Sequence, residues 1–171
     1  MLYNIFSTIT IVLSIFLGAF VYLSDSKSRV NKIFMLMISS LVLWIFTNLM
    51  TDISTDIINI FFWSQITIIG PLFFCYSLYR LSIIFPIEKK IKPIIEILHI
   101  VIILTILLLI PTSFNISGVY NNSGNIPTIE TGVLYVLFAP YFFCIVIYSI
   151  FNLYSRYREF NQSQKLQVKY I

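Results

Sequence analysis

Five long apolar stretches alternate with short polar segments along the chain. They cover residues 2–23, 33–50, 58–85, 93–110 and 133–154. A helix needs about 20 apolar residues to cross a hydrocarbon layer about 30 Å thick, so each stretch is predicted to be a membrane-spanning helix. The pattern therefore predicts an all-α fold, a polytopic transmembrane helical bundle with five spans.

Prolines interrupt two of these stretches, and a polar segment separates the last two. Gly70 and Pro71 lie near the middle of the third stretch and Pro140 lies in the fifth. Because proline has no amide hydrogen to donate, we expect hinges at these positions. Residues 111–132 are rich in Ser, Asn, Gly and Pro, which predicts a loop outside the membrane.

The composition supports the membrane interpretation. Hydrophobic residues make up 58% of the chain and charged residues only 11%, which is too little charge to cover a soluble domain. No basic residue precedes the first stretch, and the stretch does not end in a good cleavage site. We therefore expect it to be a retained span and not a signal peptide. We expect a transmembrane domain over residues 1–154, followed by a basic cytoplasmic exit helix over residues 155–171.

The basic residues indicate the orientation of the spans. With five spans, all 11 fall on one side of the membrane, while Asp52, Asp56 and Glu130 lie on the other. Short cytoplasmic loops retain Lys and Arg, so the N-terminus is predicted outside and the C-terminus in the cytoplasm of a multi-pass protein of the cell (inner) membrane. The basic residues are Lys27, Arg29, Lys32, Arg80, Lys89, Lys90, Lys92, Arg156, Arg158, Lys165 and Lys169.

Three ionisable residues are predicted to lie within or near the hydrocarbon layer. Glu96 and His99 are one helical turn apart near the cytoplasmic start of the fourth span. They either have a structural role at headgroup level or sense a proton or a ligand. Arg80 either extends its guanidinium to the interface or pairs with Glu96.

Four residues near the outer ends of the spans could line an outward-facing pocket of aromatic and amide character. They are Asn48, Trp63, Gln65 and Tyr135. The alternative is that the aromatic residues anchor the interface and the amides bond helix to helix.

Several kinds of function are not indicated. His99 is the sole histidine, and neither Cys75 nor Cys144 lies at a recognised ligand spacing, so we expect no metal site and no cofactor. Catalytic motifs are absent, which predicts that the chain is not an enzyme. The basic side would face the anionic inner leaflet, so the net charge of +4 does not imply nucleic-acid binding.

The pattern resembles the N-terminal seven-helix membrane sensor module of bacterial histidine kinases and some diguanylate cyclases. The residues that carry the resemblance are 40–50 with Trp44, 61–74 continuing to 86, 131–135, and the exit segment 154–171. The resemblance implies an extracellular N-terminus, two further spans and a cytoplasmic output domain, of which this chain would cover about the first five helices.

We therefore predict a non-catalytic sensory input module of a bacterial two-component signal transduction system. It would relay a ligand or membrane signal to a cytoplasmic kinase or cyclase output partner, with the lipid bilayer as its other partner. The alternatives are a structural or interaction subunit of a membrane complex and, third, a small transporter. The sequence leaves open the ligand and whether the chain forms a homodimer.

Overall fold

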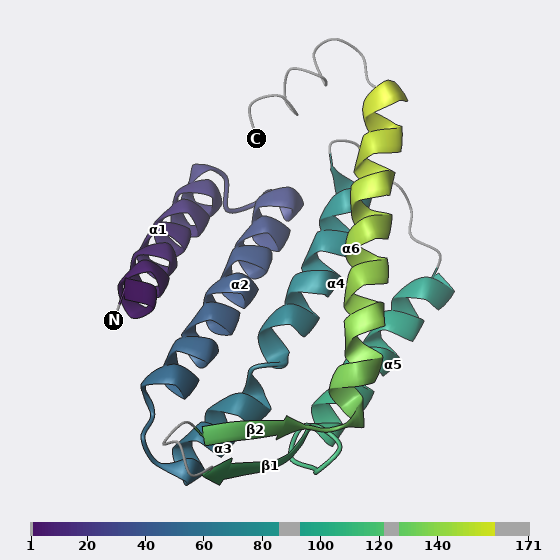
Figure 1. Cartoon of the computed structure of the whole chain (residues 1–171). Coiled ribbons are helices and arrows are strands. Elements are labelled where there is room, and N and C mark those ends of the chain that lie inside the picture. Colours follow the sequence, from purple (N-terminus) through teal and green to yellow (C-terminus); the bar gives the residue numbers. More distant parts are fainter. Residues whose placement is uncertain (1, 86–92, 122–126, 160–171) are drawn as a thin grey trace.

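The computed structural model describes residues 2–85, 93–121 and 127–159, and it forms a helical bundle with a small hairpin across one end (Figure 1). The helices and strands are α1 (Leu2–Ser24), α2 (Arg29–Ile53), α3 (Ile57–Ile66), α4 (Ile69–Ile84), α5 (Pro93–Leu109), β1 (Ile116–Asn121), β2 (Pro127–Thr131) and α6 (Val133–Glu159).

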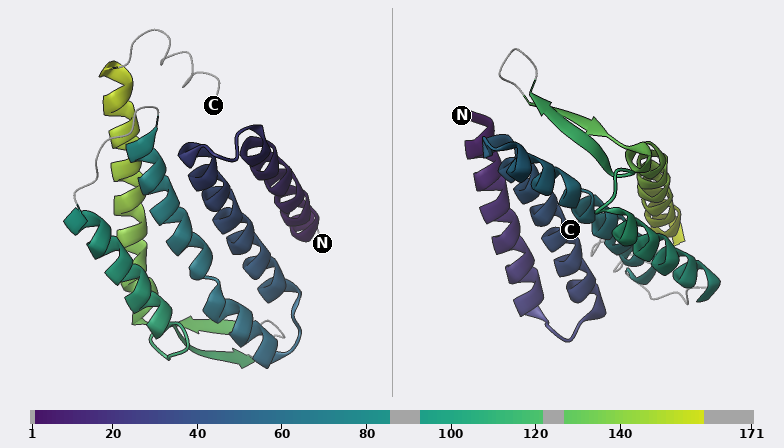
Figure 2. Two further views of the ribbon diagram at one scale, coloured as in Figure 1. Left: turned by 180° about the vertical axis from the view of Figure 1, so that it is seen from behind. Right: turned by 90° about the horizontal axis from the view of Figure 1, so that it is seen from below.

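Helix α4 lies at the centre of the bundle. It packs against α2 on one side and α6 on another, and α1 lies at the edge against α2 (Figures 1 and 2). Ile68, Leu72, Ile103, Ile106 and Phe138 form a buried apolar cluster where α4, α5 and α6 meet. The outer surfaces of α1, α5 and α6 are covered with exposed Leu, Ile, Val and Phe side chains, as expected for helices that face lipid.

The third apolar stretch is interrupted, whereas the sequence predicted a kink at Gly70 and Pro71. Helix α3 ends at Ile66 and α4 begins at Ile69, so Pro71 lies in the first turn of the second helix. Proline is tolerated there because its missing amide hydrogen would be unpaired in a first turn, but it cannot donate to the carbonyl of Thr67. The missing bond explains a break at Thr67 and Ile68.

The segment predicted as a loop, residues 111–132, includes two strands. It contains the antiparallel hairpin β1–β2, in which Val119 pairs with Ile129 and the register shifts between Ile116 and Gly118. The architecture is therefore all-α apart from one hairpin. Strand pairing satisfies backbone groups that a disordered polar loop would leave to water.

Four of the five predicted spans are long and apolar enough to cross a membrane, among the residues described. They are Leu2–Ser24, Arg29–Ile53, Ile57–Ile84 and Val133–Ser155. The remaining predicted span is a helix, Pro93–Leu109, whose 17 residues lie at the lower limit of about 17 residues for a crossing helix.

The two ends of the bundle differ in the charges they carry. The turn that joins α1 to α2, with Lys27, lies at the same end as the C-terminal end of α6 (Figure 1). Asp52 is in the last turn of α2, Asp56 precedes α3, and Glu130 belongs to β2 at the opposite end. The first residues of the predicted exit helix continue α6 without a break to Glu159. The rest of the exit helix, residues 160–171, lies outside the described part of the chain, as do Lys89, Lys90 and Lys92.

Candidate functional site

A cavity of about 180 Å³, here called the outer cavity, lies under the hairpin at the acidic end of the bundle. It joins four elements that are far apart in the sequence, because α2, α3, α6 and the hairpin each contribute side chains. The lining residues are Asn48, Thr51, Ser64, Thr67, Ile116, Ile129, Thr131 and Tyr135. The outer cavity is thus lined mainly by hydroxyl and amide groups.

Three of the six polar residues around the outer cavity, Asn48, Thr51 and Thr67, already donate to carbonyls of their own helices. The Asn48 amide donates to the Trp44 carbonyl at 2.8 Å, and the Thr67 hydroxyl donates to the Trp63 carbonyl at 2.9 Å. The Ser64 hydroxyl is different, since it is buried and has no hydrogen-bond partner in the described structure. Buried polar groups are normally paired, so Ser64 leaves an unmet hydrogen-bonding requirement at the cavity wall.

The structure brings together two of the four residues predicted to form a pocket. Asn48 and Tyr135 both line the outer cavity, but Trp63 and Gln65 do not. Trp63 packs edge-on against Phe46, with ring centroids 5.7 Å apart, and the Gln65 carbonyl accepts a hydrogen bond from Asn115. The difference arises because neighbouring residues on a helix point to different faces.

A second cavity, here called the apolar groove, adjoins the outer cavity. It has a volume of about 230 Å³ and lies between α2, α4 and α6, at the break in the third span. Thr67 and Tyr135 line both spaces. The other lining residues are Trp44, Ile68, Pro71, Phe138, Ala139, Phe142 and Phe143.

The hairpin that covers the outer cavity is fixed to the helices by Asn115. Its fully buried amide donates to the Gln65 carbonyl at 2.8 Å and to the Ile110 carbonyl at 3.2 Å. Asn115 was not among the residues predicted to form a site. Its position just before the first strand, in a segment rich in turn residues, was the available signal.

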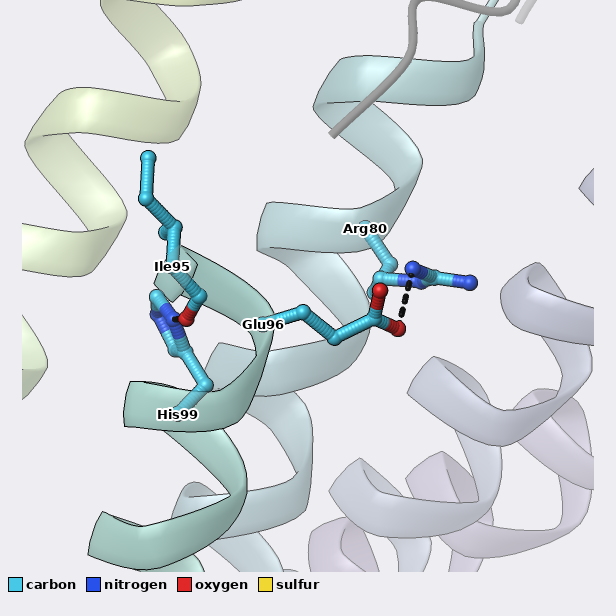
Figure 3. Close-up of polar contacts among 4 residues, drawn as sticks. All are labelled: Arg80, Ile95, Glu96 and His99. Atoms are coloured by element: carbon cyan, nitrogen blue, oxygen red, sulfur yellow. Dashed lines mark hydrogen bonds and ion pairs between the residues drawn. The ribbon is translucent and has the colours of Figure 1, made fainter. Parts of the chain in front are cut away.

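At the opposite end of the bundle, Arg80 and Glu96 form the ion pair that was one of two predicted arrangements. Arg80 Nη1 lies 2.7 Å from Glu96 Oε1, and the two side chains bridge α4 and α5 (Figure 3). Both are partly exposed, at 26% and 36%. This ion pair links the first turn of α5 to α4.

His99 points away from that ion pair (Figure 3). Its ring stacks on Tyr79, with centroids 4.3 Å apart, and its Nδ1 lies 2.9 Å from the Ile95 carbonyl. A carbonyl only accepts, so Nδ1 carries the hydrogen. Glu96 and His99 therefore belong to separate contacts and do not form one ionisable pair.

A further polar contact between helices, which the apolar pattern did not predict, lies near the C-terminal ends of α4 and α6. The Asn152 amide of α6 donates to the Ser82 carbonyl of α4 at 2.9 Å. An isolated amide residue in an apolar stretch often forms a hydrogen bond between membrane helices. Asn152 is such a residue, so the sequence contained a signal for this contact.

The predicted hinges have different local structures. Gly70 lies against the backbone of Trp44 in α2, so it permits close helix packing beside the break. Helix α6 continues without interruption through Pro140. Among the described residues, no group of three His, Cys, Asp or Glu side chains could hold a metal ion.

Comparison with known proteins identifies the family. A family model for the N-terminal 7TM region of histidine kinase matches residues 6–171. No curated protein and no solved structure matches the chain. The match covers nearly the whole chain and agrees with its apolar, membrane-spanning helices. The chain belongs to the family of N-terminal seven-transmembrane regions of histidine kinases, the membrane-embedded, non-catalytic sensor part of these receptors.

Proposed function

We propose that the chain receives a signal at its outer end and relays it through α6 to a cytoplasmic output domain. The observation that carries this proposal is the course of α6. Tyr135, in its first turn, lines the outer cavity, and Asn152, near its other end, is bonded to α4. One uninterrupted helix thus connects the cavity to the segment that leaves the bundle.

The length of α6 suits this role. Its 27 residues extend about 40 Å at 1.5 Å per residue, enough to cross the hydrocarbon layer and continue beyond it. A packed helix transmits displacement because its backbone bonds hold it rigid along its axis. A change in the packing around Tyr135 would therefore move the end of α6 from which an output domain would follow.

Helix α4 offers a second connection between the two ends. Thr67, just before its N-terminus, lines the outer cavity, and its C-terminal half carries Arg80 and Ser82. These two residues bond to α5 and α6, respectively. The break before Ile69 gives α3 and α4 freedom to shift against each other, as interrupted helices do in other membrane proteins.

The topology belongs to the same proposal: five spans, the N-terminus outside, and the output side in the cytoplasm of the inner membrane. Three observations support it. The hairpin and the loop between α2 and α3 share one end, α5 runs toward that end, and the turn that contains Lys27 lies at the opposite end (Figure 1). Lys and Arg are retained on the cytoplasmic side during insertion.

The relay is tested by changing the contact between α4 and α6 in the protein as its gene encodes it, reconstituted in lipid nanodiscs. Asn152→Leu removes the hydrogen bond to Ser82, and we expect the phosphorylation or cyclase activity of the output domain to change about fivefold or more. Thr105→Val is the matched control, because the Thr105 hydroxyl bonds only the Val101 carbonyl of its own helix and is exposed.

Equal output activity of the wild-type protein, Asn152→Leu and Thr105→Val would contradict the relay through α6. Purification with no kinase or cyclase, either in the same polypeptide or bound to it, would contradict the assignment of a signalling role. In that case an interaction subunit of a membrane assembly becomes the better explanation.

A further inference from the structure

We propose that the outer cavity and the apolar groove form one binding site for an amphiphile with an uncharged hydrogen-bonding head and a single short alkyl chain. The head would occupy the outer cavity and the chain the apolar groove. The binding site itself does not depend on the proposed function. Only the assignment of this ligand as the stimulus of the relay rests on it.

The two spaces adjoin each other. Thr67 and Tyr135 line both of them, and both residues lie at the level of the break between α3 and α4. A tyrosine suits this boundary because its ring is apolar and its hydroxyl is polar. A ligand whose polarity changes along its length would match the change of lining at Thr67 and Tyr135.

The chemistry of the outer cavity selects the head. Its polar lining consists of one amide, one phenol and four aliphatic hydroxyls, and none of its described lining residues is charged. Asn48, Thr51 and Thr67 already donate within their helices and can still accept, and the unpaired Ser64 hydroxyl can donate or accept. A neutral head with hydroxyl or amide donors fits, whereas a carboxylate or phosphate would find no cation.

The apolar groove selects the chain. Its lining includes four large aromatic side chains, Trp44, Phe138, Phe142 and Phe143, and none of its lining residues is charged. Ala139 and Phe143 are exposed on the lipid-facing side of α6, so the groove is open toward the bilayer. A ligand could therefore enter from the outer leaflet without crossing water.

The sizes support a joint site. The outer cavity of about 180 Å³ and the apolar groove of about 230 Å³ are each smaller than typical small-molecule pockets, which begin at about 300 Å³. Together they exceed that limit. A short single chain matches this volume, whereas a membrane phospholipid with two long chains does not.

Trp44 gives a direct measurement of binding because it lines the apolar groove. The full chain with Trp63→Phe, which leaves Trp44 as its sole tryptophan, is reconstituted in phospholipid vesicles. The probe is a monoacylglycerol with a decanoyl chain that carries a terminal bromine, which quenches tryptophan fluorescence on contact. We expect quenching that saturates and that unbrominated monodecanoylglycerol reverses.

Two variants test the two halves of the site, each with a matched control. Ser64→Ala removes the unpaired hydroxyl and should weaken binding about fivefold to tenfold, whereas Ser149→Ala, which removes another buried unpaired hydroxyl outside both cavities, should not. Ala139→Phe fills the groove and should abolish saturable quenching. Val136→Phe, on the lipid-exposed surface of the same helix, should leave it unchanged.

Three results would overturn the proposal. Quenching that rises linearly with probe and is equal in all variants would mean partition into the bilayer only. Equal competition by decane would mean an apolar ligand without a bound head. Equal competition by decanoate, an anion at neutral pH, would mean that the outer cavity does not select an uncharged head. If Ala139→Phe fails to fold, the contrast between Ser64→Ala and Ser149→Ala still decides the question.

This experiment is independent of the relay. Binding is read from Trp44 without any output domain, so failure to bind leaves the relay through α6 standing. Saturable binding that leaves output activity unchanged would support the site and contradict the assignment of this ligand as the stimulus.

Discussion

Gly70 of α4 lies directly against the backbone of Trp44 in α2. A methyl group added to Gly70 would come within 2.7 Å of the Trp44 amide nitrogen and 2.6 Å of its Cβ. Backbone atoms cannot move aside as a flexible side chain does, so the spacing of α2 and α4 depends on the absence of a side chain at Gly70. The contact is next to the apolar groove, which Trp44 also lines.

Gly70→Ala is therefore expected to destabilise the bundle by about 1–3 kcal/mol, because α2 and α4 must separate to admit the methyl group. The measurement is reversible unfolding in mixed detergent micelles. Gly18→Ala is the control, since its added methyl group would meet only the side chains of Ile38 and Met35, at 3.0 Å. Equal stability of the two variants would show that the contact between Gly70 and Trp44 does not limit the packing.

The ion pair between Arg80 and Glu96 should show energetic coupling. We expect Arg80→Gln and Glu96→Gln each to destabilise the protein, because each leaves a partly buried charge without its partner at 2.7 Å. In the double variant the loss should be smaller than the sum, with a coupling energy of about 0.5–3 kcal/mol. Unfolding of all four proteins completes the cycle, and additive losses would mean that the two charges act independently.

Asn115 should be required for the attachment of the hairpin. Asn115→Ala removes hydrogen bonds to the Gln65 and Ile110 carbonyls at a fully buried position, so we expect a loss of about 1–3 kcal/mol and faster proteolysis of the hairpin. Ser117→Ala is the control, since the exposed Ser117 hydroxyl makes one long bond of 3.3 Å. Proteolysis of Asn115→Ala at the control rate would assign the attachment to other contacts.

The five-span topology predicts which positions are accessible from each side of the membrane. With Cys144→Ala as background, Glu130→Cys should react with an impermeant maleimide in intact cells, whereas Lys27→Cys and Ser155→Cys should react only after permeabilisation. Fully buried Cys75 should remain unlabelled. If α5 did not cross the membrane, Glu130→Cys would be protected and Ser155→Cys would react from outside.

The sequence by itself determined the membrane class and the family. Apolar stretches of this length and number cannot all be buried in a small protein core and are stable as helices in lipid. Their lengths match the thickness of the hydrocarbon layer. The same apolar pattern predicted α1, α2 and α6 closely, since a helix in lipid satisfies its own backbone groups and needs no partner to form. Lone polar residues such as Arg80 and Glu96 also suggested their pairing, because a charge near lipid requires an opposite charge or the interface.

Only the tertiary structure decided which side chains share a space. The outer cavity joins Asn48, Ser64 and Tyr135 from three helices under a hairpin that the loop composition did not reveal. It excludes Trp63 and Gln65, although they flank Ser64 in sequence, because helix rotation sets which residue faces the cavity. A one-dimensional pattern of apolar residues contains no information on the rotation of a helix or on the contacts between helices.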